Sequence, residues 1–228
     1  MISRRGLLAG ACGLIASGAD ALPSRPLPPG FRPGFRFLNP ATPAPSLTWD
    51  PAFTSTAITL SNNNLTAKNG GTGSDKQTRF NKACPSGKSF VAAYYNSGPS
   101  DPGGFGLANA SAGIDQGYFG GRNFTMGYYK VGTLIFPDHQ LSVNAYNPGD
   151  RVEIAYDGTA KLLWARSVTN GTPASWNGST TANPATGVGG QTFDAGTAPF
   201  FGAVNANGGS QWTVTQDGTP PAGFAYPS

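Results

Sequence analysis

Apolar residues occur in short runs along most of the chain, and polar turn residues separate these runs. Beyond residue 22, no stretch has the apolar spacing of an amphipathic helix. The clearest pattern is that of Val152, Ile154 and Tyr156, which alternate with Arg151 and Glu153. Strict alternation predicts a strand with one buried face and one solvent-exposed face.

Similar short runs predict about ten strands in the whole chain. They cover residues 47–49, 57–60, 64–67, 89–95, 104–108, 124–129, 140–146, 151–156, 161–165, 199–204 and 211–215. The pair Asp157–Gly158 predicts a tight hairpin turn between two of these strands. Many short strands at close spacing predict an all-β fold, a two-sheet antiparallel sandwich of the jelly-roll kind.

The composition favours the same fold class. The 228 residues include 33 Gly and 20 Pro, and each Gly or Pro inside a helix costs about 1 or 3 kcal/mol relative to Ala. The 14 Phe and 4 Trp are enough to fill one core between two sheets. One globular domain is therefore expected.

The first 21 residues have the pattern of an export signal. Arg4 and Arg5 precede a weakly apolar run, and Ala19 and Ala21 form an A-x-A cleavage signature. The paired arginines resemble those of a twin-arginine signal, and an ordinary secretory signal would lead to the same export. We expect a short signal helix, cleavage after Ala21, and a bacterial protein that reaches the periplasm, the cell surface or the medium.

The mature chain divides into an arm and a domain. Residues 22–45 form a proline-rich arm or linker, and residues 46–228 form the sandwich domain. The arm carries Arg25, Arg32 and Arg36. It is interpreted either as a docking segment for a partner or as a passive spacer.

Charge and cysteine content exclude several partners. Removing Arg4, Arg5 and Asp20 changes the formal charge from +4 to +3, and no basic stripe suited to phosphate contacts remains, so nucleic acid is not an expected partner. After cleavage Cys84 is the only cysteine, which predicts a buried, inert thiol without a disulfide. No cofactor is expected.

Several motifs together resemble one family. Residues 147–158, followed by 161–164 (KLLW), resemble the G-D-x-[IV]-x-[IV]-x-x-D...[KR]-L-W core of SPRY-like domains. Residues 104–108 (GFGLA) are similar to the family's V-G-[IV]-A strand, and 127–129 (GYY) to its G-Y motif. Residues 200–204 (FFGAV) are similar to its aromatic-P-A-V strand.

The resemblance covers residues 46–216 and has definite implications. Residues 176–190 are similar to an insertion of bacterial and phage members. The resemblance implies a concanavalin-like sandwich and a binding module whose ligands differ between members. Ala165-Arg166 stands where members usually have an aromatic residue, and Gly202 where they have proline, so no known ligand surface is carried over.

An enzyme on the same sandwich is the main alternative. Glycoside hydrolases use two neighbouring carboxylates, and Glu153, the single glutamate, with Asp157 is the candidate pair. We expect instead an outward-facing strand residue and a turn-forming aspartate. His139, the only histidine, lies in a turn without a G-x-S-x-G motif, which predicts an exposed loop residue and no serine hydrolase.

A calcium site is the second alternative. Asn96, Asp101, Asn109 and Asp115 lie in loops and carry the oxygen ligands that calcium prefers. Asn and Asp are equally the usual residues of turns, and no D-x-[DN]-x-[DN]-G loop is present. No bound metal is therefore expected.

Loop aromatics are the remaining candidates for ligand contacts. Trp176 with Asn177, and Tyr118 with Arg122, lie in turn-rich segments. Exposed aromatics stack on sugar rings or anchor protein epitopes, whereas Trp176 folded back over the sandwich edge would be structural. We expect an exported, non-catalytic binding module for a polysaccharide or protein partner, with a glycoside hydrolase or a structural envelope protein as alternatives.

Overall fold

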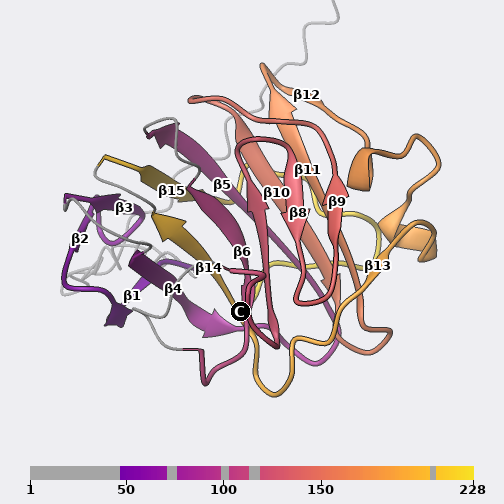
Figure 1. Ribbon diagram of the computed structural model, residues 1–228, viewed down its shortest axis with the longest axis horizontal. Helices are drawn as coiled ribbons and strands as arrows, with labels where there is room; N and C mark the ends of the chain where they lie inside the picture. Colours follow the sequence, from indigo (N-terminus) through magenta and orange to yellow (C-terminus); the bar gives the residue numbers. More distant parts are fainter. Residues whose placement is uncertain (1–46, 71–75, 99–102, 113–118, 206–208) are drawn as a thin grey trace, which may run out of the picture. The chain divides into compact units, whose positions relative to one another are not determined.

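The computed structural model describes residues 47–70, 76–98, 103–112, 119–205 and 209–228 (Figure 1). The expected signal helix and the proline-rich arm lie outside these residues. Within them the helices are two short 3-10 turns, η1 (Trp176–Gly178) and η2 (Pro184–Thr186). None of the described helices is long and apolar enough to cross a membrane.

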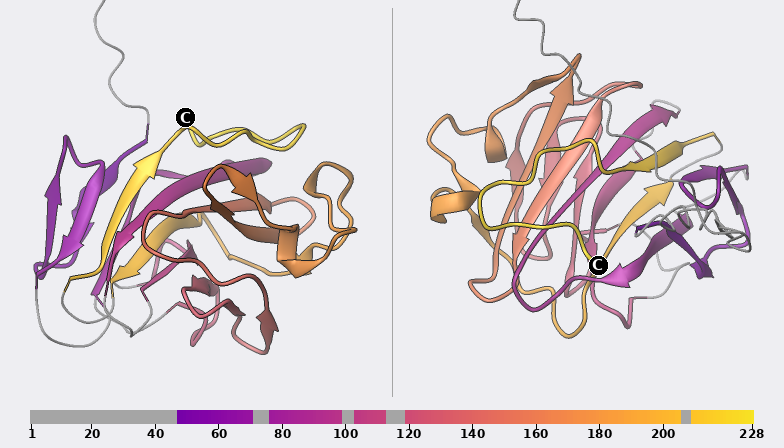
Figure 2. Two further views of the ribbon diagram at one scale, coloured as in Figure 1. Left: turned by 90° about the horizontal axis from the view of Figure 1, so that it is seen from above. Right: turned by 180° about the vertical axis from the view of Figure 1, so that it is seen from behind.

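Two antiparallel sheets form the described domain, as the sequence predicts (Figure 2). In order across the first, sheet A, lie β1 (Trp49–Thr54), β4 (Lys76–Ala83), β14 (Phe200–Asn205), β6 (Gly104–Ala108), β7 (Thr125–Tyr129), β8 (Thr133–Ile135) and β9 (Gln140–Ser142). In order across the second, sheet B, lie β12 (Thr172–Pro173), β11 (Leu162–Thr169), β10 (Arg151–Asp157), β5 (Lys88–Ser97), β15 (Gln211–Thr215), β3 (Thr66–Asn69) and β2 (Ile58–Ser61). A short strand, β13 (Gln191–Thr192), also pairs with β11. The fold is therefore an all-β sandwich.

Aromatic side chains fill the space between the sheets. The ring of Trp212 lies 5.0 Å from that of Tyr95 and 5.7 Å from that of Tyr146. The Tyr146 hydroxyl donates to the carbonyl oxygens of Gly103 and Tyr128 at 2.8 and 3.0 Å. Burial of these large rings supplies the main stabilising free energy, and each buried hydroxyl needs such partners.

The alternation in β10 is confirmed for its inner face only. Val152, Ile154 and Tyr156 point into the core and are at most 1% exposed. The opposite face was expected to be wet, but Glu153 and Ala155 are fully buried. That expectation is wrong because a distant part of the chain covers this face.

The covering segment is the C-terminal strap, residues 216–228, which crosses the outer face of sheet B (Figure 2, right). The Phe90 amide donates to the Ala225 carbonyl oxygen at 2.8 Å, and the Phe224 ring lies 6.1 Å from that of Trp164. A Cβ at Gly218 would lie 3.0 Å from Glu153 Oε1 and from the Phe90 ring, so a larger residue there would have to displace one of them. Full burial of Phe90 and Trp164 is worth roughly 1.5–3 kcal/mol each, which makes the strap part of the folded domain.

Candidate functional site

Three connections meet at one end of the sandwich, called the loop end. They are residues 84–87 between β4 and β5, residues 158–161 between β10 and β11, and residues 193–199 before β14. Strand pairing brings them together, because Ala83 is opposite Phe200 and Asp157 is opposite both Lys88 and Leu162. Backbone hydrogen bonds fix the junctions, with the Cys84 amide donating to the Pro199 carbonyl oxygen at 2.8 Å.

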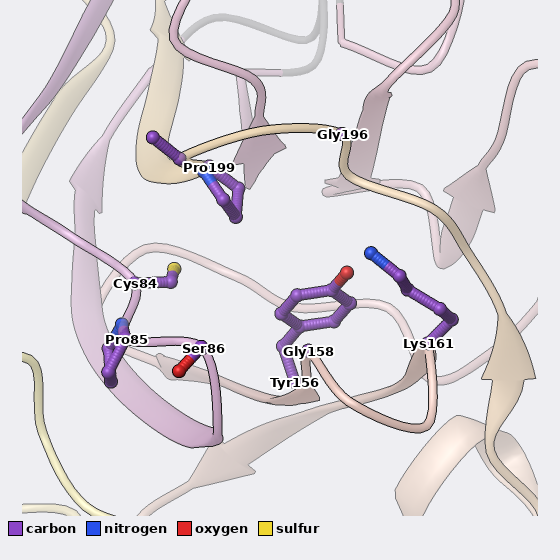
Figure 3. A pocket seen from close by; sticks show the side chains of 9 residues that line it. Cys84, Pro85, Ser86, Tyr156, Gly158, Lys161, Gly196 and Pro199 are labelled. Carbon is purple, nitrogen blue, oxygen red and sulfur yellow. The ribbon is translucent and has the colours of Figure 1, made fainter.

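A cavity of about 270 Å³ opens between these connections (Figure 3). It is lined by Cys84, Pro85, Ser86, Tyr156, Gly158, Lys161, Gly196, Ala198 and Pro199. The Tyr156 hydroxyl and the Lys161 ammonium group both face the open space, with Pro199 across from them (Figure 3). We call this cavity the Tyr156–Lys161 pocket.

Tyr156 enters the pocket from the end of β10. Its side chain is 1% exposed, and burial raises the pKa of its hydroxyl above the ordinary tyrosine value. The hydroxyl donates to the Phe193 carbonyl oxygen at 3.5 Å and accepts from the Ala195 amide at 3.4 Å. Both distances are at the long limit of a hydrogen bond, so the neutral hydroxyl keeps capacity for a closer partner.

Lys161 enters from the loop between β10 and β11. The predicted tight turn at Asp157 is a longer loop, Gly158–Lys161, in which Asp157 Oδ1 accepts from the amides of Thr159 and Ala160. Lys161 has φ 56°. This left-handed conformation closes the loop immediately before β11 (Leu162–Thr169).

The Lys161 ammonium forms one ion pair. Its Nζ lies 3.0 Å from Asp194 Oδ1, and the two side chains are 43% and 60% exposed. This hydrogen bond raises the pKa of Lys161, while the Gly196 amide and then Lys161 lower the pKa of Asp194. Both groups are charged at neutral pH, and their exposure makes the pair exchangeable.

Cys84 lies in the pocket wall as a buried thiol, which confirms the predicted burial. Burial raises the pKa of the Cys84 thiol far above its ordinary range. A protonated thiol is a poor nucleophile. The geometry therefore assigns Cys84 to packing.

A second hollow of about 360 Å³ borders residues 192–194. It is lined by Asn123, Phe124, Pro137, Asp138, Thr192, Phe193 and Asp194. Asp194 borders this hollow and pairs with the lysine of the first. The Lys161–Asp194 ion pair thus links the Tyr156–Lys161 pocket to the second hollow, because each cavity is lined by one of the two residues.

Comparison with solved structures identifies the fold. The SPRY domain of human HERC1 matches with a TM-score of 0.55 at 13% identity, covering 75% of this chain and 99% of that one. The PSpry domain of TRIM65 matches with a TM-score of 0.55 at 12% identity, covering 75% and 92%. The fold is that of an SPRY domain.

Further matches place limits on what the SPRY fold implies. Stonustoxin matches with a TM-score of 0.54 at 13% identity, over 74% of this chain but 27% of the toxin chain. No protein-family model matches the sequence, and no curated protein matches it. At this level of identity the SPRY fold is shared, and function has to be argued from the residues of this chain.

In this SPRY fold, Trp176 and Asn177 lie away from the Tyr156–Lys161 pocket. They were candidates for exposed ligand contacts, with a Trp176 folded back over the sandwich edge as the alternative, and they are 8% and 6% exposed. The Asn177 side-chain oxygen accepts from the Ala165 amide at 2.8 Å, and its Nδ2 donates to the carbonyl oxygens of Leu163 and Gly189. The Asn177 amide thus takes the place of a strand partner along β11, and the structure gives both side chains a packing role.

The other predicted contact residues have different locations. Tyr118 lies outside the described residues. Arg122 is exposed, and its carbonyl oxygen accepts from the Thr125 amide and hydroxyl. Phe119 is buried over the backbone of Gly106 and Gly127, where a side chain would collide with it.

The alternative metal and catalytic sites are not assembled among the described residues. No group of three potential His, Cys, Asp or Glu ligands occurs there. Asn96 Oδ1 accepts from the Thr213 hydroxyl, and Asn109 Oδ1 accepts from Ser111, while Asp101 and Asp115 lie outside the described residues. His139 is exposed as predicted and lies 2.7 Å from Asp138.

Glu153 faces outward from the SPRY sandwich, as expected, but is enclosed beneath the strap. Arg151 Nε and Nη2 lie 3.0 and 2.8 Å from Oε1, and Arg166 Nε and Nη2 each lie 2.7 Å from Oε2. The Arg166 guanidinium in turn lies 4.1 Å from the Trp176 ring centre. We call Arg151, Glu153 and Arg166 the arginine–glutamate triad, in which both carboxylate oxygens are occupied.

Sequence reasoning missed the Tyr156–Lys161 pocket. Tyr156 was placed correctly as an inward strand residue, whereas Lys161 was expected at the start of the next strand and lies in the loop before it. The pocket also needs residues 84–86 and 196–199, which are far away in sequence. The sequence offered one signal for this site, which is that Lys161 ends the loop that follows the inward-facing Tyr156.

Proposed function

We propose that the mature chain is an exported, non-catalytic binding module that holds an exposed segment of a partner protein at the loop end. The observation that supports this most is the Tyr156–Lys161 pocket. Pockets for drug-sized ligands span about 300–1,000 Å³, so a cavity of about 270 Å³ suits one side chain of a bound polypeptide. Apolar walls at Pro85 and Pro199 with two polar groups suit such a side chain.

The described carboxylates do not favour hydrolysis. Glu153 and Asp157 are four residues apart on one strand, which separates them by about 13 Å at a rise of 3.3 Å per residue. Retaining and inverting glycosidases need about 5 to 9.5 Å between their carboxyl groups. Glu153 also forms ion pairs with two arginines. Asp157 accepts hydrogen bonds from the backbone amides of Thr159 and Ala160 in its turn.

A protein partner is favoured over a polysaccharide by the position of Trp176. Sugar recognition by stacking needs an exposed aromatic face, and the Trp176 ring is covered on one side by Arg166. The resemblance to SPRY-like domains also implies a binding module. Export is supported by the Arg4–Arg5 pair and the Ala19–Ala21 signature, and it places the partner in the periplasm or at the cell surface.

The test is a selection of peptides with the mature chain beginning at Leu22. A phage-displayed random peptide library is selected on the immobilised protein, and enriched peptides are titrated against two variants. Ser86→Trp fills the rim of the pocket, whereas Val131→Trp adds the same ring at an exposed site at the other end of the sandwich. We expect saturable binding that Ser86→Trp abolishes and Val131→Trp leaves unchanged.

Two results would contradict the proposal. Equal loss of binding in both variants, or in neither, would show that the loop end is not the binding surface. Polysaccharide binding without any peptide binding, measured in a parallel glycan screen, would support the polysaccharide alternative. Release of reducing ends in the same wells would support the hydrolase.

A further inference from the structure

The Tyr156–Lys161 pocket has an uneven distribution of charge. Among its described lining residues, Lys161 is the one that carries a charge at neutral pH, and none of them is a carboxylate. Asp194, which forms an ion pair with the lysine, lines the second hollow. An occupant of the pocket therefore meets an ammonium group that is paired with Asp194, and it meets no carboxylate among the described lining residues.

The second polar group in the pocket is also a donor. The Tyr156 hydroxyl is neutral, buried and held by two contacts of 3.4 and 3.5 Å. A group that accepts at about 2.7 Å makes a stronger bond than either contact. Lys161 and Tyr156 face the same space (Figure 3), so one acceptor group can receive bonds from both.

We propose that the Tyr156–Lys161 pocket binds the side-chain carboxylate of an aspartate or glutamate in the partner protein. Lys161 forms the ion pair, Tyr156 donates to the same carboxylate, and Pro85 and Pro199 pack against the methylene groups. This inference rests on the proposed function and names the partner chemistry at the same site. A phosphate is a poorer match, because its greater charge is usually met by clustered arginines with forked donors.

Asp194 has a defined part in this scheme. It is an internal carboxylate that competes with the partner's carboxylate for Lys161. Exchange is inexpensive because exposed ion pairs contribute little. Asp194 also keeps the Gly196 amide, 2.9 Å away, as a partner when Lys161 binds the partner's carboxylate instead. Asp194→Asn is therefore expected to strengthen binding of an acidic side chain.

The experiment uses the ¹⁵N-labelled mature protein and a matched pair of small probes. The acidic probe is N-acetyl-glutamic acid amide, and its control is N-acetyl-glutamine amide, which has the same shape without the charge. We expect saturable shifts of the Gly158, Lys161 and Gly196 amides with the acid alone. Lys161→Met should weaken binding about tenfold or more, as expected for loss of a charge-assisted bond. Lys161→Arg should retain binding, and Asp194→Asn should tighten it severalfold.

The outcomes separate this inference from the proposed function. Equal shifts with the acid and the amide, or unchanged binding in a folded Lys161→Met variant, overturn the carboxylate site. Shifts with galacturonate but not with the glutamate probe overturn the assignment to a protein side chain. Selected peptides that Ser86→Trp blocks but Lys161→Met does not would overturn this inference and leave the proposed function standing.

Discussion

Replacing Glu153 with glutamine tests the arginine–glutamate triad. The substitution keeps the size of the side chain but removes the charge that holds two guanidinium groups under the C-terminal strap. Breaking a buried ion pair by neutralising one partner costs about 3–5 kcal/mol. Arg151 and Arg166 are 17% and 18% exposed, so partial solvation favours the lower limit, about 3 kcal/mol. At about 2–4 °C per kcal/mol for a domain of this size, Tm should fall by about 6–12 °C.

The assay is urea unfolding of the mature protein, followed by tryptophan fluorescence, alongside calorimetry. The control replaces all three residues at once, Arg151→Met, Glu153→Leu and Arg166→Met. Buried ion-pair groups exchanged for apolar side chains of similar volume are often neutral or stabilising, so this variant should lie close to wild type. If Glu153→Gln unfolds within about 0.5 kcal/mol of wild type, the range of an ordinary surface substitution, the triad is not desolvated and the reasoning is refuted. Loss of a hydrolytic activity with stability intact would instead revive the glycoside hydrolase.

Three other predictions concern groups buried by the fold. Cys84 should react with a thiol reagent far more slowly than an exposed thiol, because its thiol is buried and protonated, and fast labelling of the native protein would contradict its burial. Burial raises the pKa of Tyr128 and Tyr226 to about 12, so their stabilising contribution is complete below the unfolded value of about 10 and is lost as pH rises toward 12. Unfolding free energy measured from pH 8 to 12 should therefore fall above about pH 10, and a flat profile would oppose this. Asn177→Ala should cost about 2–4 kcal/mol in urea unfolding, because it leaves an amide and a carbonyl group of β11 unpaired, whereas a change below 1 kcal/mol would indicate that water replaces the side chain.

The fold was predictable because most of its strands carry their own pattern. β10 shows it best, since the inward positions of Val152, Ile154 and Tyr156 follow from alternation alone. The same rule failed for β4 (Lys76–Ala83), which was not predicted. Its buried side chains include Gln77 and Thr78 together with Phe80, so the strand has no apolar pattern and owes its place to pairing with β1 and β14.

The candidate site was less predictable because it depends on long-range contacts. The sequence left two interpretations of Trp176 open, an exposed aromatic or a side chain folded over the sandwich edge, because its neighbours along the chain are polar. Its actual neighbours include Arg166, and the Asn177 amide binds the backbone of β11. Likewise the alternating pattern of β10 predicts that Glu153 is exposed to solvent. It is buried because the C-terminal strap covers that face of the strand. Local pattern determines which way a strand residue points, but not what later covers it.

The strand order has a consequence for how the protein is made. β14 lies between β4 and β6, and β15 lies between β5 and β3, so each sheet lacks an inner strand until residues 200–215 have been synthesised. The two sheets cannot be completed before these strands have been synthesised, and the high contact order of the domain favours slow folding. The newly made chain therefore spends an interval with two open strand edges in each sheet, which are the sites where intermolecular pairing begins. This interval is the point at which the protein is most dependent on chaperones and most sensitive to its own concentration.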